Sequence, residues 1–398
     1  MKKKTKNKKQ DENKINACAV TDKGLGDVAL KELKELTGVK GVAGDRTIVF
    51  KPRSYNDLFK YCYYSQAARR ILLLFRQFTF SDYKDLMKKS ETAIKNIDLK
   101  EWFDKDTSFR VECERIGKHD FSSQQVEAEL GEKIILKAKQ ALKKEPAVNL
   151  DNPEVIFYLF ISQEKAFLGL DLAGRDLSKR HYRIFSSPGS INACLSYALT
   201  RIAGYTPGKK LIDPHCKSGV LCIEAALFAS KKSIHYYSKE FAFKKLKPFK
   251  RMRWDSFFKK LDSEKGVKDI HLLGTDSLLR NIEASNKNAK LAGAGDLTRF
   301  SKMDVEWLDT KLDKASVDIL ASRIQCPSKH VSEKRLQKHY KELFYQAEFI
   351  MKDKGVIALL TEDAKLLKNS VSKTFKIISE QNFWAGKQKY EVVLIERM

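Results

Sequence analysis

The chain lacks a hydrophobic run long enough to cross a membrane. Its longest purely apolar runs, such as residues 71–75, fall far short of the ~18–20 residues that a bilayer requires. No apolar secretory segment is expected either. Apolar and aromatic residues are not scarce, since they make up 42% and 10% of the 398 residues. Disorder of the whole chain is therefore excluded, and two or three domains are expected at this length.

Paired cysteines are also missing. The seven cysteines are odd in number and scattered, and no two of them form a Cys-x-x-Cys pair. This spacing argues against a zinc ribbon and against a disulfide framework, and no metal site is expected. Reduced and mostly buried thiols are predicted, as in a cytoplasmic protein, and the lysine-rich N-terminus leaves the nucleus open as an alternative.

Acidic residues are too few to balance the basic ones. The sequence has 76 Lys and Arg against 51 Asp and Glu, which gives a net charge of +25. Such an excess favours a polyanionic partner, and nucleic acid is the leading candidate, although a basic surface also serves solubility alone. Residues 1–14 hold seven lysines without apolar periodicity and are predicted to be a disordered basic tail.

A second basic segment, residues 231–260, holds eleven Lys or Arg against two acidic residues and carries eight aromatic rings. Basic side chains among aromatic rings suit a nucleic-acid surface, with phosphates on the lysines and bases on the rings. We favour a different role for the rings, which are expected to pack as core against the nearby C-terminal sheet with the basic residues outward.

The first part of the chain has the mixed pattern of α+β structure. In residues 15–80 the expected strands are 15–20, 47–50 and 70–75, and the expected helices are 21–36 and 55–68. In residues 80–177 we expect a strand at 108–115, a helix at 124–139 and a hairpin of strands 155–162 and 166–171.

From residue 210 onward, strands alternate with helices, which predicts a doubly wound parallel sheet. The expected strands are 210–213, 270–274, 298–301, 317–321 and 356–361, and the expected helices are 219–230, 277–291, 332–351 and 363–373. The closing strands 375–379 and 390–397 have no room for a crossover helix between them, so they should pair antiparallel. An antiparallel final hairpin is typical of class I methyltransferases.

Acidic residues follow three of these strands. Asp213 opens a turn, residues 213–219, in which backbone N–H groups and a helix N-terminus can approach a ligand. Asp276 follows the next strand and can accept hydrogen bonds from both hydroxyls of a ribose, and Asp304 follows the third and can meet an adenine amine. The alternative is an ordinary α/β protein whose strands end in Asp caps.

The chain resembles the THUMP-domain class I RNA methyltransferases, in particular the branch that acts on the exocyclic amine of guanine in tRNA. The similar blocks are residues 17–36, Arg115-x-Gly117-x-His119-x-Phe121-Ser122-Ser123, Gly174-x-x-Leu177-x-Lys179-Arg180-x-Tyr182-Arg183 and Asp213-Pro214-x-Cys216-x-Ser218-Gly219. The resemblance implies an α/β plus α+β fold with an N-terminal ferredoxin-like domain (15–80), a THUMP RNA-binding domain (81–177), a linker (178–190) and a Rossmann-type methyltransferase domain (191–398).

This resemblance implies S-adenosylmethionine as the cofactor and tRNA as the partner, with rRNA as the alternative. The THUMP domain would hold the RNA while the sheet edge receives a base extruded from its stack. The implied cofactor residues are Asp213, Pro214, Cys216, Ser218, Gly219, Asp276 and Asp304. The implied RNA-binding residues are Arg110, Arg115, Lys118, His119, Ser123, Lys179, Arg180 and Arg183. A monomer without a membrane partner is expected, and a small activating protein subunit stays open.

Two departures from the family pattern fall on its working parts. The family's cofactor loop reads Asp-Pro-x-Cys-Gly-Ser-Gly, but Lys217 replaces the first glycine, which gives up close approach and free positive φ. Its ammonium would also repel the methionine ammonium of the cofactor, unless it points to solvent. The family's Asn-Pro-Pro-Tyr motif, which holds the target amine, is replaced by Ser322-Arg323-Ile324-Gln325.

Ser322 and Gln325 are therefore the candidate catalytic positions of a degenerate motif. Losing preorganised hydrogen-bond acceptors typically costs about 10²–10³ each in rate. Two functions stay open at this point: a tRNA guanine-N2 methyltransferase, or a catalytically inactive relative that docks tRNA or rRNA through its THUMP domain. The retained acidic residues favour the first, and the altered motif favours the second.

Overall fold

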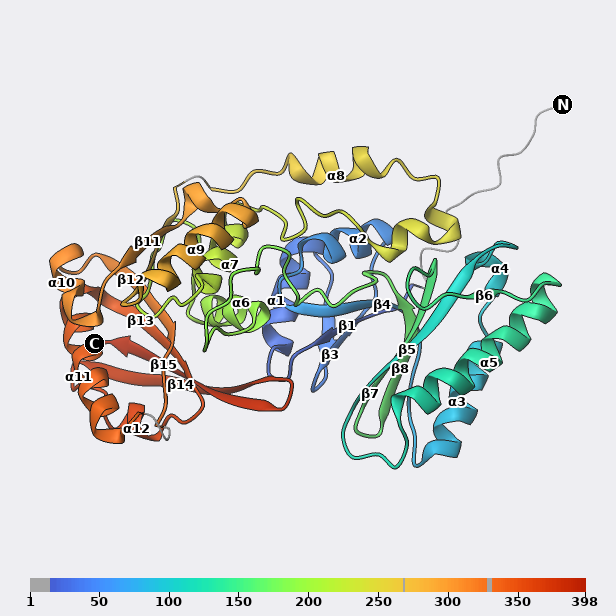
Figure 1. Ribbon diagram of the computed structural model, residues 1–398, viewed down its shortest axis with the longest axis horizontal. Helices are drawn as coiled ribbons and strands as arrows, with labels where there is room; N and C mark the ends of the chain where they lie inside the picture. Colours follow the sequence, from blue (N-terminus) through green and yellow to red (C-terminus); the bar gives the residue numbers. More distant parts are fainter. Residues whose placement is uncertain (1–14, 268, 328–330) are drawn as a thin grey trace.

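The computed structural model describes residues 15–267, 269–327 and 331–398, so the predicted tail at 1–14 lies outside the described residues. The chain forms two sheets, one from each half of the sequence (Figure 1). The first has eight strands in the order β2-β3-β1-β4-β8-β7-β5-β6, and the second has seven in the order β11-β10-β9-β12-β13-β15-β14. The predicted fold class, α+β followed by a doubly wound α/β domain, is confirmed.

The N-terminal quarter of the chain forms four strands and two helices of the first sheet. They are β1 (Ala17–Thr21), α1 (Gly26–Thr37), β2 (Gly41–Ala43), β3 (Thr47–Phe50), α2 (Tyr55–Tyr64) and β4 (Ala68–Thr79). The Ser54 side chain accepts from the backbone N–H of Asp57 and so caps α2. The sequence pattern predicted all of these elements except β2, which is only three residues long.

The next hundred residues complete the same sheet. Their elements are α3 (Tyr83–Lys95), α4 (Leu99–Trp102), β5 (Ser108–Ile116), α5 (Ser123–Leu142), β6 (Ala147–Val148), β7 (Val155–Ser162) and β8 (Lys165–Asp171). The long strand β4 pairs antiparallel with β1 on one side and with β8 on the other. The two units that were expected to be separate therefore share one continuous sheet.

The C-terminal half forms the parallel sheet, with an antiparallel end. Its elements are α6 (Ala193–Ile202), β9 (Lys210–Asp213), α7 (Val220–Ala229), α8 (Trp254–Asp262), β10 (His271–Asp276), α9 (Leu279–Ala292), β11 (Arg299–Lys302), α10 (Leu308–Lys311), β12 (Val317–Arg323), α11 (Glu333–Ile350), β13 (Met351–Thr361), α12 (Lys365–Lys368), β14 (Phe375–Ala385) and β15 (Gln388–Arg397). The antiparallel pairing of β14 with β15 is as predicted. The predicted helix 363–373 is wrong in extent, since α12 is four residues long.

Residues 231–266, here called the strap, leave the C-terminal domain and cross over α2 (Figure 1). Its buried rings pack on Phe59 of α2, with centroid distances of 4.5 Å to Phe243, 4.9 Å to Phe249 and 5.1 Å to Trp254. The prediction that these rings are core is confirmed, but the prediction that they pack on the C-terminal sheet is wrong. They join the two halves of the molecule instead.

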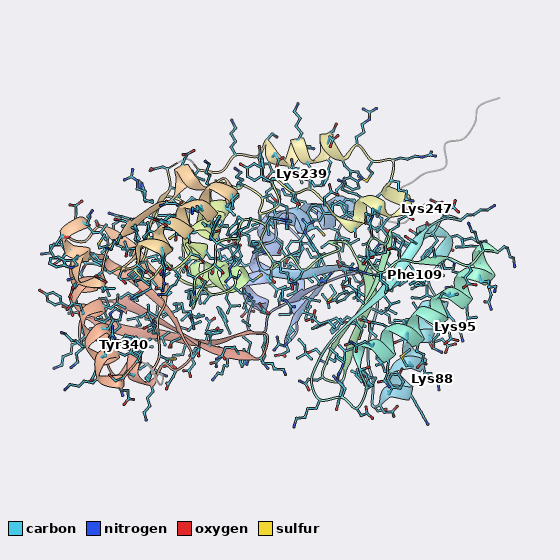
Figure 2. The ribbon with its side chains drawn as sticks, in the orientation of Figure 1. Lys88, Lys95, Phe109, Lys239, Lys247 and Tyr340 are labelled. Carbon is cyan, nitrogen blue, oxygen red and sulfur yellow. The ribbon has the colours of Figure 1, made fainter. Side chains whose placement is uncertain are left out.

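Several lysines of the strap also bind the first half of the chain. Lys247 donates to the backbone carbonyls of Lys100 at 2.7 Å and Phe103 at 3.1 Å, at the end of α4. Lys250 donates to Glu154 at 2.7 Å. Figure 2 shows Lys239 and Lys247 along this crossing. Part of the basic excess that suggested a nucleic-acid surface is therefore used inside the molecule.

Candidate functional site

The seven-stranded sheet reverses its winding between β9 and β12. β10 and β11 lie on one side of β9, whereas β12 pairs with its other side and leads on to β13. Ligands of open α/β sheets bind outside the carboxyl ends of the strands at such a switch point. The turn at 213–219 and the end of β12 meet at this place, as the sequence predicted.

The turn after β9 keeps the features of a ligand-binding loop. Gly219 has a φ of +77°, and a Cβ at this position would approach Phe300 and Ser285 to within 3 Å. Asp213 is buried, and it accepts from the backbone N–H of His215 at 3.1 Å and from Ser322 Oγ at 2.6 Å. Burial raises the pKa of the Asp213 carboxyl to about 7, although the Ser322 hydrogen bond opposes this shift.

Lys217 turns into the site rather than to solvent. Its backbone φ is +53°, a left-handed value that favours glycine. Its N–H donates to Asp276 Oδ2 at 3.2 Å, and its Nζ lies 3.6 Å from the same oxygen, with the side chain 22% exposed. Asp276 Oδ1 accepts from the Leu278 N–H at 3.0 Å and from Asn281 Nδ2 at 2.8 Å. Both oxygens of the carboxylate that was predicted to hold a ribose are therefore already bonded.

Two histidines that the sequence interpretation did not single out lie beside this turn. His215 Nδ1 is 3.3 Å from Ser322 Oγ, and His215 Nε2 is 2.7 Å from Nε2 of His339 on α11. Burial lowers the pKa of both imidazoles, and at His215 the neighbouring His339 adds to the effect. His215 occupies a variable position of the loop motif, and His339 lies far along the chain, so no local pattern joins them.

The end of β12 differs from the predicted loop. Ser322 and Arg323 are paired with Leu359 and Leu360 of β13, and the N–H of Ile324 donates to the Leu360 carbonyl at 3.0 Å. Proline has no N–H and stops such a ladder, whereas Arg and Ile continue it. The loss of both prolines thus extends the strand through residues that were expected to form a loop.

This extension removes one candidate catalytic residue from the surface. Ser322 is fully buried and donates to Asp213, so the prediction that it contacts a target amine is corrected. Gln325 is exposed, and its backbone carbonyl accepts from the Tyr340 hydroxyl. The structure does not bring these two candidate positions together on one surface.

Arg323 closes the site from the other side. One guanidinium nitrogen donates to the carbonyl of Gly189 in the linker, and the other lies 2.6 Å from Glu362 Oε1. The guanidinium also lies 5.7 Å from the centre of the Tyr390 ring. The linker is fastened to the turn a second time, since Ser190 Oγ is 2.8 Å from Ser218 Oγ.

Two cavities of very different volume lie at the carboxyl edge of the seven-stranded sheet. Beside the turn, the linker and Arg323, the cavity measures about 20 Å³. A second cavity of about 410 Å³ lies next to Asp304, between Ser277, Met303 and Trp307. Sites for small molecules typically enclose about 300–1,000 Å³. The space beside Asp304 is therefore large enough for the adenine of S-adenosylmethionine, whereas Lys217 occupies the ribose position on Asp276 and the methionine half does not fit in this conformation.

The other implied cofactor residues line the floor of the turn. Pro214 and Cys216 are buried, and the Cys216 thiol lies 3.8 Å from Ser285 Oγ. Burial raises its pKa well above the ordinary value, which fits the predicted packed thiol. Six of the seven cysteines are buried and Cys326 is half-buried, as expected. The described residues contain no group of three or more side chains that could hold a metal ion.

Four of the five implied RNA-binding residues of the first half lie around the end of β5 and the start of α5, whereas Arg110 lies near the start of β5. Lys118 is exposed, His119 Nε2 lies 2.9 Å from the Gln163 carbonyl, and the Arg115 guanidinium lies 5.8 Å from the Phe121 ring. Ser123 opens α5. On β5, Arg110 is half-buried against the carbonyl of Leu150 and Glu112.

Of the implied residues in the connecting segment, Lys179 is exposed, Arg183 is half-buried and Arg180 is buried. Arg180 donates to Glu224 Oε1 at 3.0 Å and to Oε2 at 3.1 Å, and also to the Gln66 carbonyl at 2.7 Å. The prediction that Arg180 binds RNA is corrected, because its guanidinium is fully engaged inside the protein.

No helix in the described part of the chain has both the length and the apolar character that a membrane crossing needs.

The sheet order and the site together define the class of the C-terminal half. A mostly parallel sheet whose last strand, β15, lies antiparallel between β13 and β14, with a ligand edge at its switch point, is the class I methyltransferase fold. The chain belongs to the family described as RMKL-like, methyltransferase domain, whose model matches residues 180–389. A THUMP domain model, of an RNA-binding type, matches residues 87–171. The resemblance predicted from the sequence is confirmed.

Relatives with curated names cover most of the chain. The tRNA (guanine(6)-N2)-methyltransferase of Methanocaldococcus jannaschii is 25% identical over 371 residues, which are 91% of this chain and 95% of that protein. The ribosomal RNA large subunit methyltransferase K/L of Photobacterium profundum is 26% identical, and the match covers 73% of this chain but 41% of that protein.

Solved structures share the complete fold. The crystal structure of SMU.472 complexed with SAH has a TM-score of 0.80 at 19% identity and covers 96% of this chain and 97% of that chain. TrmN from Thermus thermophilus has a TM-score of 0.69 at 24% identity, over 96% of this chain and 100% of that one. At these identities the likeness establishes the fold.

Proposed function

We propose that this chain binds tRNA, and that the chemistry of its sheet edge is methyl transfer from S-adenosylmethionine to the exocyclic amine of a guanine. The observation that carries the proposal is the near end-to-end match with a relative named as a tRNA (guanine(6)-N2)-methyltransferase, over 91% of one chain and 95% of the other. Relatives named for ribosomal RNA share less than half of their own length with this chain, so tRNA is the favoured RNA.

In this proposal each predicted domain has a separate role. The THUMP domain, within 81–177, binds the RNA, and the 178–190 linker leads to the methyltransferase domain at 191–398. A guanine must leave its stack to reach the carboxyl edge of the sheet, where Gln325 and Asp304 are exposed. The proposal includes that the protein is a monomer, which light scattering tests. The family resemblance also leaves open a further partner, a small activating protein subunit.

RNA binding is tested at Lys118, an exposed lysine between β5 and α5. A lysine that contacts phosphate strengthens binding to all sequences alike through counterion release. We expect Lys118→Ala to weaken tRNA binding about threefold to tenfold, and to lower the slope of log K against log salt by about one. Filter binding across a salt series measures both quantities. Lys376→Ala, at an exposed lysine of β14, is the matched control, and equal losses in both variants would refute the assignment.

A second candidate function is supported by the burial of Ser322. This side chain bonds to Asp213 inside the sheet, so the position that holds the target amine in the family cannot do so here. Docking of tRNA without methyl transfer is therefore the alternative. Methyl transfer is favoured over docking alone if another exposed group accepts the hydrogen bonds of the target amine in place of the family's Asn and Pro residues.

One experiment separates these two candidates. The full chain is incubated with bulk tRNA and methyl-labelled S-adenosylmethionine, and tRNA retention is measured on the same samples. Labelled tRNA supports transfer and excludes the docking role as the whole function. Retained but unlabelled tRNA supports docking and excludes transfer by the chain alone. A parallel reaction without RNA corrects for self-labelling of the protein.

A further inference from the structure

Two cations of the chain occupy the half of the donor site where space is missing. Lys217 projects from the turn after β9, and Arg323 projects from the end of β12, on the two sides of the switch point. Both line the cavity of about 20 Å³ that remains there. Such a volume holds about one water molecule.

Lys217 takes a hydrogen-bonding position that a nucleoside needs. Its ammonium lies 3.6 Å from Asp276 Oδ2, and its backbone N–H donates to the same oxygen. The other oxygen, Oδ1, is already shared by Leu278 and Asn281. A ribose that bonds to Asp276 must displace the ammonium. The positively charged sulfonium of the ligand would then lie in the small cavity beside the displaced ammonium of Lys217. Among the described residues, Asp276 is the carboxylate with which Lys217 forms an ion pair, so the displaced ammonium would lose this partner.

Arg323 ties the linker to the sheet. Its guanidinium joins the Gly189 carbonyl of the linker to Glu362, which follows β13. Gly189 has a φ of +80°, and a Cβ there would lie 2.8 Å from the Arg323 guanidinium, so the two are in tight contact. The Ser190–Ser218 hydrogen bond holds the same linker against the turn.

We infer that the methyl-donor site of the free protein is closed from within by Lys217 and Arg323, and that S-adenosylmethionine enters only when both side chains release their partners. The inference rests on the proposed function insofar as it concerns the same site. It adds a specific reason for weak donor binding, which is separate from the altered amine-binding motif. The open cavity beside Asp304 remains accessible in the closed state.

The inference is tested by calorimetric titration of the full chain with S-adenosylmethionine, S-adenosylhomocysteine and adenosine. Charge-assisted contacts of this kind change an equilibrium about tenfold to a hundredfold. We expect Lys217→Gly to bind S-adenosylmethionine at least tenfold more tightly than the wild type does. The gain should be smaller for S-adenosylhomocysteine and for adenosine, because these ligands carry no sulfonium and profit only from the freed Asp276 oxygen. Adding Arg323→Gln should increase the first gain further.

The chain offers a matched control for the lysine substitution. Lys231 also has a φ of +53°, and it follows α7 just as Lys217 precedes it, but its side chain is exposed and outside the site. Lys231→Gly removes the same charge and the same backbone strain. A gain with this variant equal to that of Lys217→Gly would overturn the inference, and so would tight donor binding by the wild type with no gain in the variant.

Two further measurements keep the test decisive. Melting temperatures without ligand show whether each variant is folded, and Lys217→Asn, which also tolerates a left-handed backbone, replaces the glycine variant if that one is unstable. Binding of tRNA is measured on the same proteins. If the wild type does not bind tRNA, the proposed function is refuted but the inference of a closed donor site is not. If the wild type binds tRNA and also binds S-adenosylmethionine tightly, the inference of a closed site is refuted but the proposed function is not.

Discussion

Two pairs of a buried carboxylate and a cation lie along the short helix α7, one at its middle and one before its first residue, and the two pairs are built differently. Glu224, on the helix, forms two hydrogen bonds with Arg180 at 3.0 and 3.1 Å, and both side chains are completely buried. At the start of the helix, Lys217 reaches Asp276 with one ammonium at 3.6 Å and stays 22% exposed. The first pair joins the two halves of the molecule, and the second fills the donor site.

The difference indicates which contact is permanent. A guanidinium presents a planar fork that matches a carboxylate, and the remaining acceptor positions of Glu224 are used by the Tyr182 hydroxyl and by Gln66. A lysine is a mobile point charge on a flexible stem, and at a partly exposed side chain such as Lys217 water can replace its single contact. The contact of Arg180 with Glu224 and Gln66, here called the seam, is therefore fixed between the two halves, whereas the donor site can open.

The largest effect is expected where the buried pair is broken. Arg180→Ala leaves Glu224 buried without its cation, which typically costs about 3–5 kcal/mol of unfolding free energy. Urea denaturation followed by circular dichroism measures the loss. Arg183→Ala serves as the control, because this half-buried arginine donates only a 3.3 Å hydrogen bond to the Ser190 carbonyl among the described contacts. A loss under about 1 kcal/mol for Arg180→Ala, the size typical of an exposed ion pair, would show that the seam is no firmer than the donor site.

The seam also shows what the sequence could not predict. The order of strands and helices in the C-terminal half, the antiparallel end and the turn at 213–219 all followed from local patterns and from the resemblance. Arg180 stood in a basic segment that matched a family block, and nothing local distinguishes a buried arginine from one that faces RNA. Its partner Glu224 lies 44 residues away, so their pairing depends on how the two sheets dock.

The same limit applied to the candidate site. The sequence predicted that Asp213, Asp276 and the end of β12 would meet, because parallel strands bring their carboxyl ends to one edge. It did not predict that the missing prolines would let β12 continue to Arg323, because a changed loop and an extended strand differ only in their pairing with β13. Nor did it pair His215 with His339, which comes from a separate helix.

A smaller effect is expected from the pH dependence of the donor site. Burial raises the pKa of Asp213 to about 7 from an ordinary value of 3.8, so the folded protein holds a proton there that the unfolded chain has lost. The stability due to this proton is fully present below about pH 4 and disappears as the pH rises through 7. Every tenfold difference in proton affinity between the folded and unfolded states corresponds to about 1.4 kcal/mol of unfolding free energy.

Melting curves between pH 5 and 8 test this expectation with Asp213→Asn. The lowered pKa values of His215 and His339 act in the opposite direction, because these imidazoles stay neutral in the folded protein while the unfolded chain takes up protons there as the pH falls below about 6.5. The wild type should therefore lose stability relative to the variant as the pH rises. Parallel curves for wild type and Asp213→Asn would contradict the assignment.

The smallest effect is expected at the strap. Its lysine contacts lie at the surface, whereas the contacts of the seam are buried. Lys247 binds two carbonyls at the end of α4, but its side chain is 39% exposed, so Lys247→Ala should cost no more than about 1 kcal/mol. Binding of tRNA by this variant should match the wild type, because the ammonium is turned toward the protein. Lys259→Ala, at an exposed lysine of α8, controls for the loss of one charge. A drop in tRNA affinity for Lys247→Ala without any loss of stability would return the strap lysines to the RNA surface that composition alone suggested.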